Sequence, residues 1–190
     1  MSDLVTSNNK DIKIKNKGTG AGGSNTNKNG LPYERITSLD TDIEIIKKHT
    51  NSNTIKFKIS NTEFEKPNKK GGLFKVLSEY LDENIEKGKG YKQPDECYIN
   101  MNGKKIFIIE KKFQQTNGSV DEKIQTPEFK IWNYSEMFPE FKIVYIYCLS
   151  NYFTPFKAEL KYLKLKKVPV FWGDSKTYKD DIIKFIVNYK

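Results

Sequence analysis

The chain has 190 residues, 36% of them hydrophobic and 30% charged, and a formal net charge of +9. This is enough for one domain with a sizeable core, and a positive surplus of that size favours a polyanionic partner. No apolar run approaches the roughly 20 residues that span a bilayer. The start, Met1-Ser2-Asp3-Leu4, lacks the apolar core of a signal peptide. We therefore expect no membrane partner and a cytoplasmic location.

Cysteine, histidine and arginine usage narrows the chemistry. Cys97 and Cys148 lie in apolar, strand-like runs, which indicates reduced core residues rather than a disulfide or a metal pair. His49 is the single histidine and argues against zinc chemistry. Arg35 is the single arginine, so guanine contacts would fall to Lys, Asn, Gln or backbone groups.

Residues 1–30 are rich in Asn, Lys, Gly, Ser and Thr, and we expect a flexible basic segment ahead of a single domain over residues 31–190. The glycine-rich stretch 18–24 follows no apolar strand and has no Gly-Lys-Ser/Thr ending, so we expect no nucleotide cofactor. Two alternatives stay open for this segment: a disordered basic tail, or a segment that orders against the DNA backbone.

The first half of the chain is expected to hold two helices and a strand. Pro32 suits the first turn of a helix, and apolar residues continue at roughly helical spacing to about Lys48, with an interruption near residues 38–40. Alternation predicts a strand over residues 54–59. Amphipathic spacing predicts a helix from Leu73 to Ile85.

A hairpin is expected next, at about residues 95–101 and 104–113, because Asn102-Gly103 is a strong signal for a type I′ turn. On that register Met101 pairs with Lys104, and Asp95 lies across from Glu110. Opposed residues have Cβ atoms only about 4.5–5.5 Å apart. The second strand is apolar on both faces, which predicts a central strand.

The second half of the chain alternates helices and strands. Ser119-Val120-Asp121-Glu122 matches a capping box, and Pro127 should kink that helix or open another to about Phe138. The remaining predicted elements are a strand at 141–149, a helix at 154–166, a strand at 168–172 and a helix at 176–189.

The paired carboxylates predict a metal site. Lys112 is two residues beyond Glu110 and therefore projects from the same face. Asp95 and Glu110 would repel each other if left without a partner, and Mg²⁺ prefers carboxylate oxygens together with water and phosphate. The alternative is that both are solvated residues at the hairpin end, with Lys112 as an ion-pair partner.

These residues resemble the PD-(D/E)XK nuclease superfamily through Pro94-Asp95 and Glu110-Lys111-Lys112. Two further segments narrow the resemblance to type II restriction endonucleases. The run 110–115 followed by 118–123 is similar to their catalytic strand and following helix, and the run 20–27 leading to 30–34 is similar to an N-terminal signature. The resemblance covers residues 18–35 and 94–138.

The resemblance implies an α/β (α+β) fold with an αβββαβ core, in which helices flank a mixed central sheet. It also implies site residues. Asp95 and Glu110 would bind Mg²⁺ with the backbone carbonyl of Lys111, and Lys112 would orient water. Glu34 would lie beside the metal, although an exposed helix carboxylate is the alternative. The DNA contacts that we expect are Gln114, Asn25, Asn27 and Lys28.

The function expected from this resemblance is sequence-specific, Mg²⁺-dependent hydrolysis of double-stranded DNA to 5′-phosphate ends by a type II restriction endonuclease. A palindromic target would favour a homodimer. Its interface is expected on the helices after Ser119, which carry Trp132, Tyr134, Met137 and Phe138. The alternatives are a PD-(D/E)XK nuclease of repair or recombination, a nicking enzyme, and a non-catalytic DNA-binding module.

Overall fold

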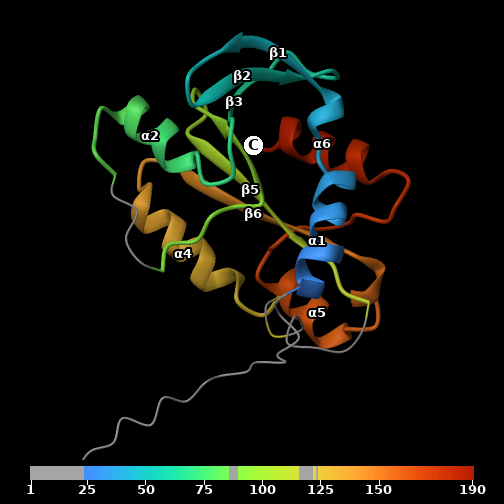
Figure 1. Ribbon diagram of the computed structural model, residues 1–190. Coiled ribbons are helices and arrows are strands. Elements are labelled where there is room, and N and C mark those ends of the chain that lie inside the picture. Colours follow the sequence, from blue (N-terminus) through green and yellow to red (C-terminus); the bar gives the residue numbers. More distant parts are fainter. Residues whose placement is uncertain (1–23, 86–89, 116–121, 123) are drawn as a thin grey trace, which may run out of the picture.

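The computed structural model describes residues 24–85, 90–115, 122 and 124–190, with the backbone alone for residues 24–29 (Figure 1). A seven-stranded sheet runs in sequence order from β1 to β7. Strands β1 to β5 pair antiparallel, whereas β5, β6 and β7 pair parallel. The strands are β1 (Ile43–Lys48), β2 (Ser52–Phe57), β3 (Glu63–Pro67), β4 (Glu96–Asn100), β5 (Lys105–Lys112), β6 (Lys142–Leu149) and β7 (Val170–Trp172).

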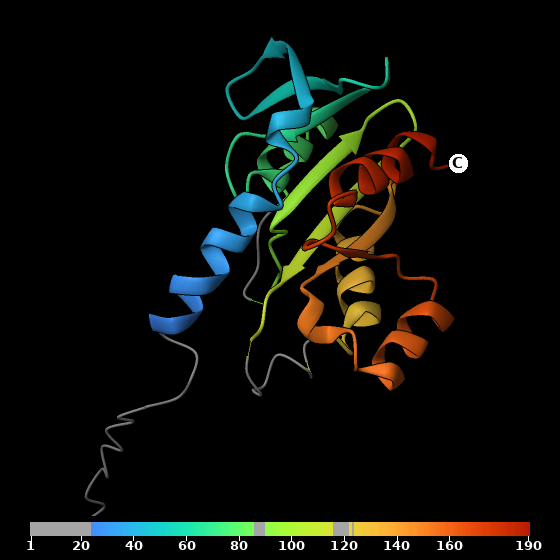
Figure 2. The same cartoon turned by 90° about the vertical axis from the view of Figure 1, so that its right-hand side faces the viewer.

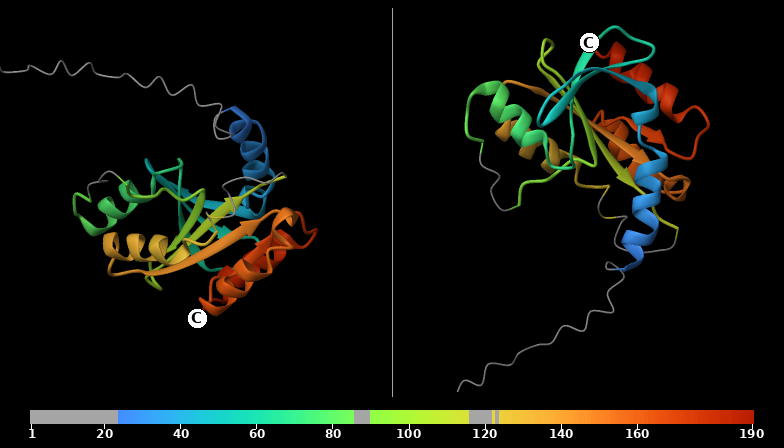
Figure 3. Two further views of the ribbon diagram at one scale, coloured as in Figure 1. Left: turned by 90° about the horizontal axis from the view of Figure 1, so that it is seen from below. Right: turned by 45° about the horizontal axis from the view of Figure 1, so that its top comes forward.

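Helices cover both faces of this mixed sheet, which makes the fold α/β as expected (Figures 1 and 3). Buried residues of α2, α4 and α5 join one core cluster, and those of α1 and α6 join another. The amino-terminal half of α1 extends away from the rest of the fold (Figure 2). The helices are α1 (Ser24–Ile36), α2 (Leu73–Leu81), α4 (Pro127–Met137), α5 (Lys157–Leu165) and α6 (Tyr178–Asn188).

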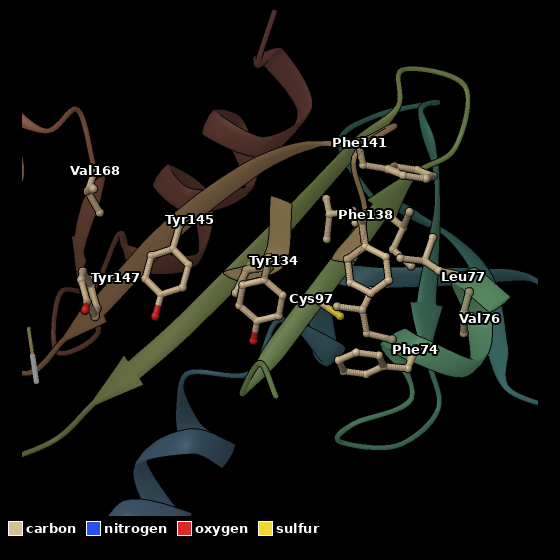
Figure 4. Packing of buried hydrophobic residues seen from close by; sticks show 14 of the residues in the cluster. Phe74, Val76, Leu77, Cys97, Tyr134, Phe138, Phe141, Tyr145, Tyr147 and Val168 are labelled. Atoms are coloured by element: carbon tan, nitrogen blue, oxygen red, sulfur yellow. The ribbon is translucent and has the colours of Figure 1, made fainter. Parts of the chain in front are cut away.

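Strand β5 lies at the centre of the fold, which confirms the prediction made from its apolar run. Ile106 and Ile108 face the α2, α4 and α5 side, where Figure 4 shows the packing. Phe107 and Ile109 face the α1 and α6 side. All four are at most 1% exposed. A strand buried on both faces reads as a continuous hydrophobic run, and this explains why the sequence identified it.

The register of the β4–β5 hairpin is the predicted one, but the turn type was wrong. Cys97 pairs with Ile108 and Asn100 with Lys105, so the connection is a four-residue loop. In that loop Lys104, not Asn102 or Gly103, has a positive φ, of 45°. Four-residue loops usually contain a type I turn. The predicted loop of two residues and the observed loop of four residues have the same centre, so they give the same pairing between β4 and β5.

Two predictions in the first third of the chain were wrong. Helix α1 begins at Ser24, so the boundary at residue 30 falls inside it, and it ends at Ile36. Residues 43–48 form the edge strand β1 instead of continuing a helix. Ile43, Ile45 and Ile46 are β-branched and favour strands, and pairing with β2 outweighs the helical spacing. Strand β3 was not predicted, because its five residues include a single large apolar side chain, Phe64.

The remaining predicted elements are confirmed, all with shorter bounds except the strand predicted at 54–59, which lies two residues earlier at Ser52–Phe57. They correspond to β2, α2, α4, β6, α5, β7 and α6. The helix expected to begin at Ser119 falls mainly outside the described residues, as does most of the 1–30 segment. Cys97 and Cys148 are free and buried, as expected. In the part of the chain that the structure describes, no helix is long and apolar enough to cross a bilayer.

Candidate active site

The structure brings Asp95, Glu110 and Lys112 together at one end of the β4–β5 hairpin. Extending the observed pairing by one residue sets Asp95 against Glu110. The backbone N–H of Lys111, the residue after Glu110, donates to Asp95 Oδ2 at 2.9 Å. Lys112 Nζ donates to Glu110 Oε1 at 2.5 Å. The predicted convergence of these three side chains is therefore present.

Glu110 is enclosed by two lysines. Its side chain is 13% exposed, and its Oε1 atom accepts from Lys112 Nζ at 2.5 Å and from Lys130 Nζ at 3.0 Å. Burial raises the pKa of the Glu110 carboxyl. The charges and hydrogen bonds of the two lysines together lower it by more, so the pKa lies below its ordinary value. The site therefore keeps Glu110 ionised, the form that binds a cation.

Lys130 reaches Glu110 from the first turns of α4, and the sequence did not single it out. Pro127 opens this helix, which packs on β6 and the site face of the sheet. Burial lowers the pKa of Lys130 more than the Glu110 charge raises it. A lysine inside an otherwise ordinary helix gives no local signal, because only the packing of α4 brings it to Glu110.

Tyr134 lies one helical turn beyond Lys130. The hydroxyls of Tyr134 and Tyr145 point in the same direction, and Tyr147 lies beside Tyr145 (Figure 4). Burial, and then the charge of Glu110, raise the pKa of all three phenols. The Tyr134 hydroxyl is buried without a hydrogen-bond partner in the structure.

The interface proposed for this helix needs correction. Tyr134 and Phe138 are 1% and 0% exposed and belong to the core, so they do not form an interface. Of the four residues named, Trp132 is the exposed one, and its ring lies 5.6 Å from that of Phe129, which is also exposed.

Asp95 has a second partner in Lys70, which joins it to Glu34. Lys70 Nζ lies 2.8 Å from Asp95 Oδ1 and 3.2 Å from Glu34 Oε2. Burial lowers the pKa of Lys70, but the two carboxylates raise it above its ordinary value. Lys70 belongs to the loop between β3 and α2, and the sequence did not single it out. One ammonium group therefore links Glu34 to Asp95.

A pocket of about 330 Å³ opens beside this cluster. Its walls come from α1, the β3–α2 loop and the start of β4. The charged residues among them are Glu34, Arg35, Asp40, Lys66, Lys69, Lys70, Asp95, Glu96 and Lys111, of which Glu96 and Lys111 are almost fully buried. The pocket gives solvent and a ligand access to the Asp95 side of the site.

Of the predicted DNA contacts, Gln114 is the one whose surroundings the structure describes. Gln114 lies just beyond β5, where its backbone N–H donates to Ser150 Oγ at 3.3 Å. Asn25, Asn27 and Lys28 belong to α1, and their side chains lie outside what the structure describes.

The donor set fits Mg²⁺ in a limited way. Among the described residues no three His, Cys, Asp or Glu side chains cluster as a metal site. Mg²⁺ is, however, usually held by one or two carboxylates, with water and substrate phosphate completing its shell. Asp95 and Glu110 supply that number, and the Lys111 carbonyl lies in the strand beside them. Both carboxylates contact lysines in this structure.

Comparisons with known proteins name no relative. No protein-family model matches the chain, and no curated protein or solved structure matches it.

Proposed function

We propose that the protein is a Mg²⁺-dependent DNA endonuclease of the PD-(D/E)XK type, acting as a type II restriction endonuclease. One observation carries the proposal: the Asp95 carboxylate accepts from the amide that follows Glu110, while Lys112 binds Glu110 on the same face. Two ionised carboxylates and a lysine at a strand end are a suitable arrangement for phosphodiester hydrolysis with a bound metal.

The order of elements supports the proposal. Helix α1, strands β3, β4 and β5, helix α4 and strand β6 follow one another in the sequence αβββαβ once α2 and the β1–β2 hairpin are treated as additions. Strands β3, β4 and β5 are antiparallel, and β6 is parallel to β5. This order agrees with the core that the resemblance implies, with Asp95 directly before the second of its strands and Glu110 in the third.

The roles follow from the contacts. Asp95 and Glu110, with the carbonyl of Lys111, would hold Mg²⁺, which when bound polarises the phosphate and lowers the pKa of a coordinated water. Lys112 positions water and donates to the developing charge on the phosphate. Lys130 keeps Glu110 ionised through a direct bond at 3.0 Å. Glu34 supports the Asp95 side through Lys70.

DNA affinity would come from lysines that meet phosphates, because the chain carries a net charge of +9. Such binding weakens steeply as salt rises. Sequence-specific recognition requires side chains that contact base edges in a groove. The proposal includes a homodimer that binds a specific recognition sequence.

The test is digestion of one long unmodified DNA with the purified protein and Mg²⁺. Discrete fragments support restriction, and run-off sequencing of cleaved plasmid then gives the site and the cut position. A smear or nicked circles would favour a repair, recombination or nicking nuclease. Complete absence of metal-dependent cleavage would favour a non-catalytic DNA-binding module. Glu110→Ala and Lys112→Ala serve as controls and should remove cleavage.

A further inference from the structure

The face of the hairpin opposite the site carries a buried ion pair. Lys111 Nζ lies 2.7 Å from Glu96 Oε2, and the two side chains are 3% and 6% exposed. Glu96 directly follows Asp95, and Lys111 directly follows Glu110. Because side chains alternate along a strand, each pair of neighbours sends one charged group to each face.

This ion pair is hydrogen-bonded to the carboxyl-terminal end of helix α1. The Lys111 ammonium also donates to the backbone carbonyl of Glu34 at 3.0 Å. That carbonyl is in the last turn of α1, where carbonyls have no partner within the helix and a positive charge is favoured by the helix dipole. Lys111 therefore caps the helix at the backbone carbonyl of Glu34, and the side-chain carboxylate of the same residue contacts Lys70 beside Asp95.

Glu96 holds the chain that leaves the helix. Its Oε1 atom accepts from the backbone N–H of Leu39 at 3.2 Å and from the Tyr98 hydroxyl at 2.5 Å. The ion pair thus contacts the main chain at Glu34 and at Leu39, on both sides of the point where α1 ends. The Glu34 carboxylate itself is tied to the site only through the flexible, half-exposed Lys70.

Stability alone is a weak reason for such a pair. Moving two charges out of water costs several kcal/mol each, and apolar replacements of similar volume are often neutral or stabilising. A buried ion pair is better explained by a role in fixing the position of the segments that it contacts, where apolar packing alone would not fix it.

We propose that Glu96 and Lys111 are positioning residues that set where α1 presents Glu34 to the Asp95 side of the active site. The inference rests on the proposed function for its catalytic readout, but its structural readout does not depend on cleavage. The side chains of the pair, as distinct from the Lys111 carbonyl, act through the main chain at the end of α1.

The main variant replaces both charges, Glu96→Leu with Lys111→Met. The matched control makes the same replacement at the other end of β5, where Lys104 Nζ and Glu140 Oε2 lie 2.9 Å apart at the surface: Lys104→Met with Glu140→Leu. Three quantities are compared with wild type: the melting temperature, the single-turnover cleavage rate in Mg²⁺, and hydrogen exchange at the Thr37 amide. That amide donates to the Tyr33 carbonyl at 3.0 Å and reports the last turn of α1 without touching a replaced side chain.

For the Glu96→Leu/Lys111→Met variant we expect a melting temperature within about 3 °C of wild type. We also expect Thr37 exchange at least about tenfold faster and cleavage slowed about tenfold. Adding Glu34→Gln should slow wild type but not this variant, because the carboxylate is already misplaced. The surface control should match wild type throughout.

Four results would overturn the inference: wild-type cleavage by the double variant, unchanged Thr37 exchange, an undiminished effect of Glu34→Gln in the variant, or an equal response of the surface control. If wild type cleaves no DNA, the proposed function fails, and Thr37 exchange alone then decides the inference. If the double variant does not fold, Glu96→Gln takes its place. It keeps an oxygen for Leu39 but removes the charge that holds Lys111, and unchanged Thr37 exchange in it would again count against the pair.

Discussion

The two faces of the β4–β5 hairpin end use the same residue types differently. On the site face, Asp95 and Glu110 are each 13% exposed and contact more lysines than there are carboxylates. On the other face, Glu96 and Lys111 form a one-to-one pair that is almost fully buried. The first face carries three lysines against two carboxylates, and this excess of positive charge favours a phosphate there. The closed pair on the second face can hold a fixed geometry.

The largest expected difference between the faces is in cleavage. Under the proposed function, Glu110→Ala or Lys112→Ala should slow single-turnover cleavage by about 10²–10³-fold, because Glu110 would hold the metal and Lys112 would meet the charge developing on the phosphate. DNA affinity measured with Ca²⁺ in place of Mg²⁺ should change little. Fluorescence anisotropy and a quenched-flow digest measure the two quantities. A variant that cuts at the wild-type rate would contradict the site assignment.

Stability should show the opposite ranking. Lys111→Met leaves Glu96 buried and unpaired, so we expect it to lower the free energy of unfolding by about 3–5 kcal/mol. Lys112→Met should cost less, about 1–2 kcal/mol, because Glu110 retains Lys130. Urea unfolding of the two variants measures the difference. Equal losses would show that the two faces are energetically alike.

Acid should weaken the site face. The pKa of Glu110 lies below its ordinary value of 4.5 in the folded protein. Its charge therefore stabilises the fold fully above that value, and the stabilisation is lost as pH falls through the lower, folded pKa. Between pH 4.5 and that folded pKa, wild type should lose more stability than Glu110→Gln, which has no proton to bind there. Parallel acid-denaturation curves for the two proteins would contradict this.

The smallest expected effect tests the unpartnered phenol near Glu110. Tyr134→Phe removes a buried hydroxyl that has no hydrogen bond, so it should leave the free energy of unfolding unchanged or raise it by up to about 1 kcal/mol. Tyr98→Phe is the matched control, because it deletes a hydroxyl that donates to Glu96 and should destabilise. Thermal unfolding measures both. Destabilisation by Tyr134→Phe would mean that its hydroxyl is bonded after all.

The sequence predicted what depends on neighbours in the chain and missed what depends on distant elements. The continuous apolar run of β5 identified the central strand, and the hairpin pairing put Asp95 across from Glu110. Strand β1 was missed because its isoleucines also match helical spacing. Lys70 and Lys130 were missed because a loop and a helix remote in sequence bring them to the carboxylates. Nothing local distinguishes them from the other lysines of a basic chain.

The length of the 101–104 loop determines which pair of charges faces the cleft. If the loop is lengthened or shortened by one residue on each side, every residue of β4 keeps its partner in β5. A single inserted residue that shifts the pairing by one would set Glu96 against Glu110 and turn Asp95 toward helix α1. Asp95 and Glu96 would then exchange faces, while Glu110 and Lys111 keep theirs. The length of this surface turn therefore determines which acidic residue lies on the same face as Glu110 at the other end of the hairpin. Insertions of odd and even length in the turn should differ in their effects on cleavage.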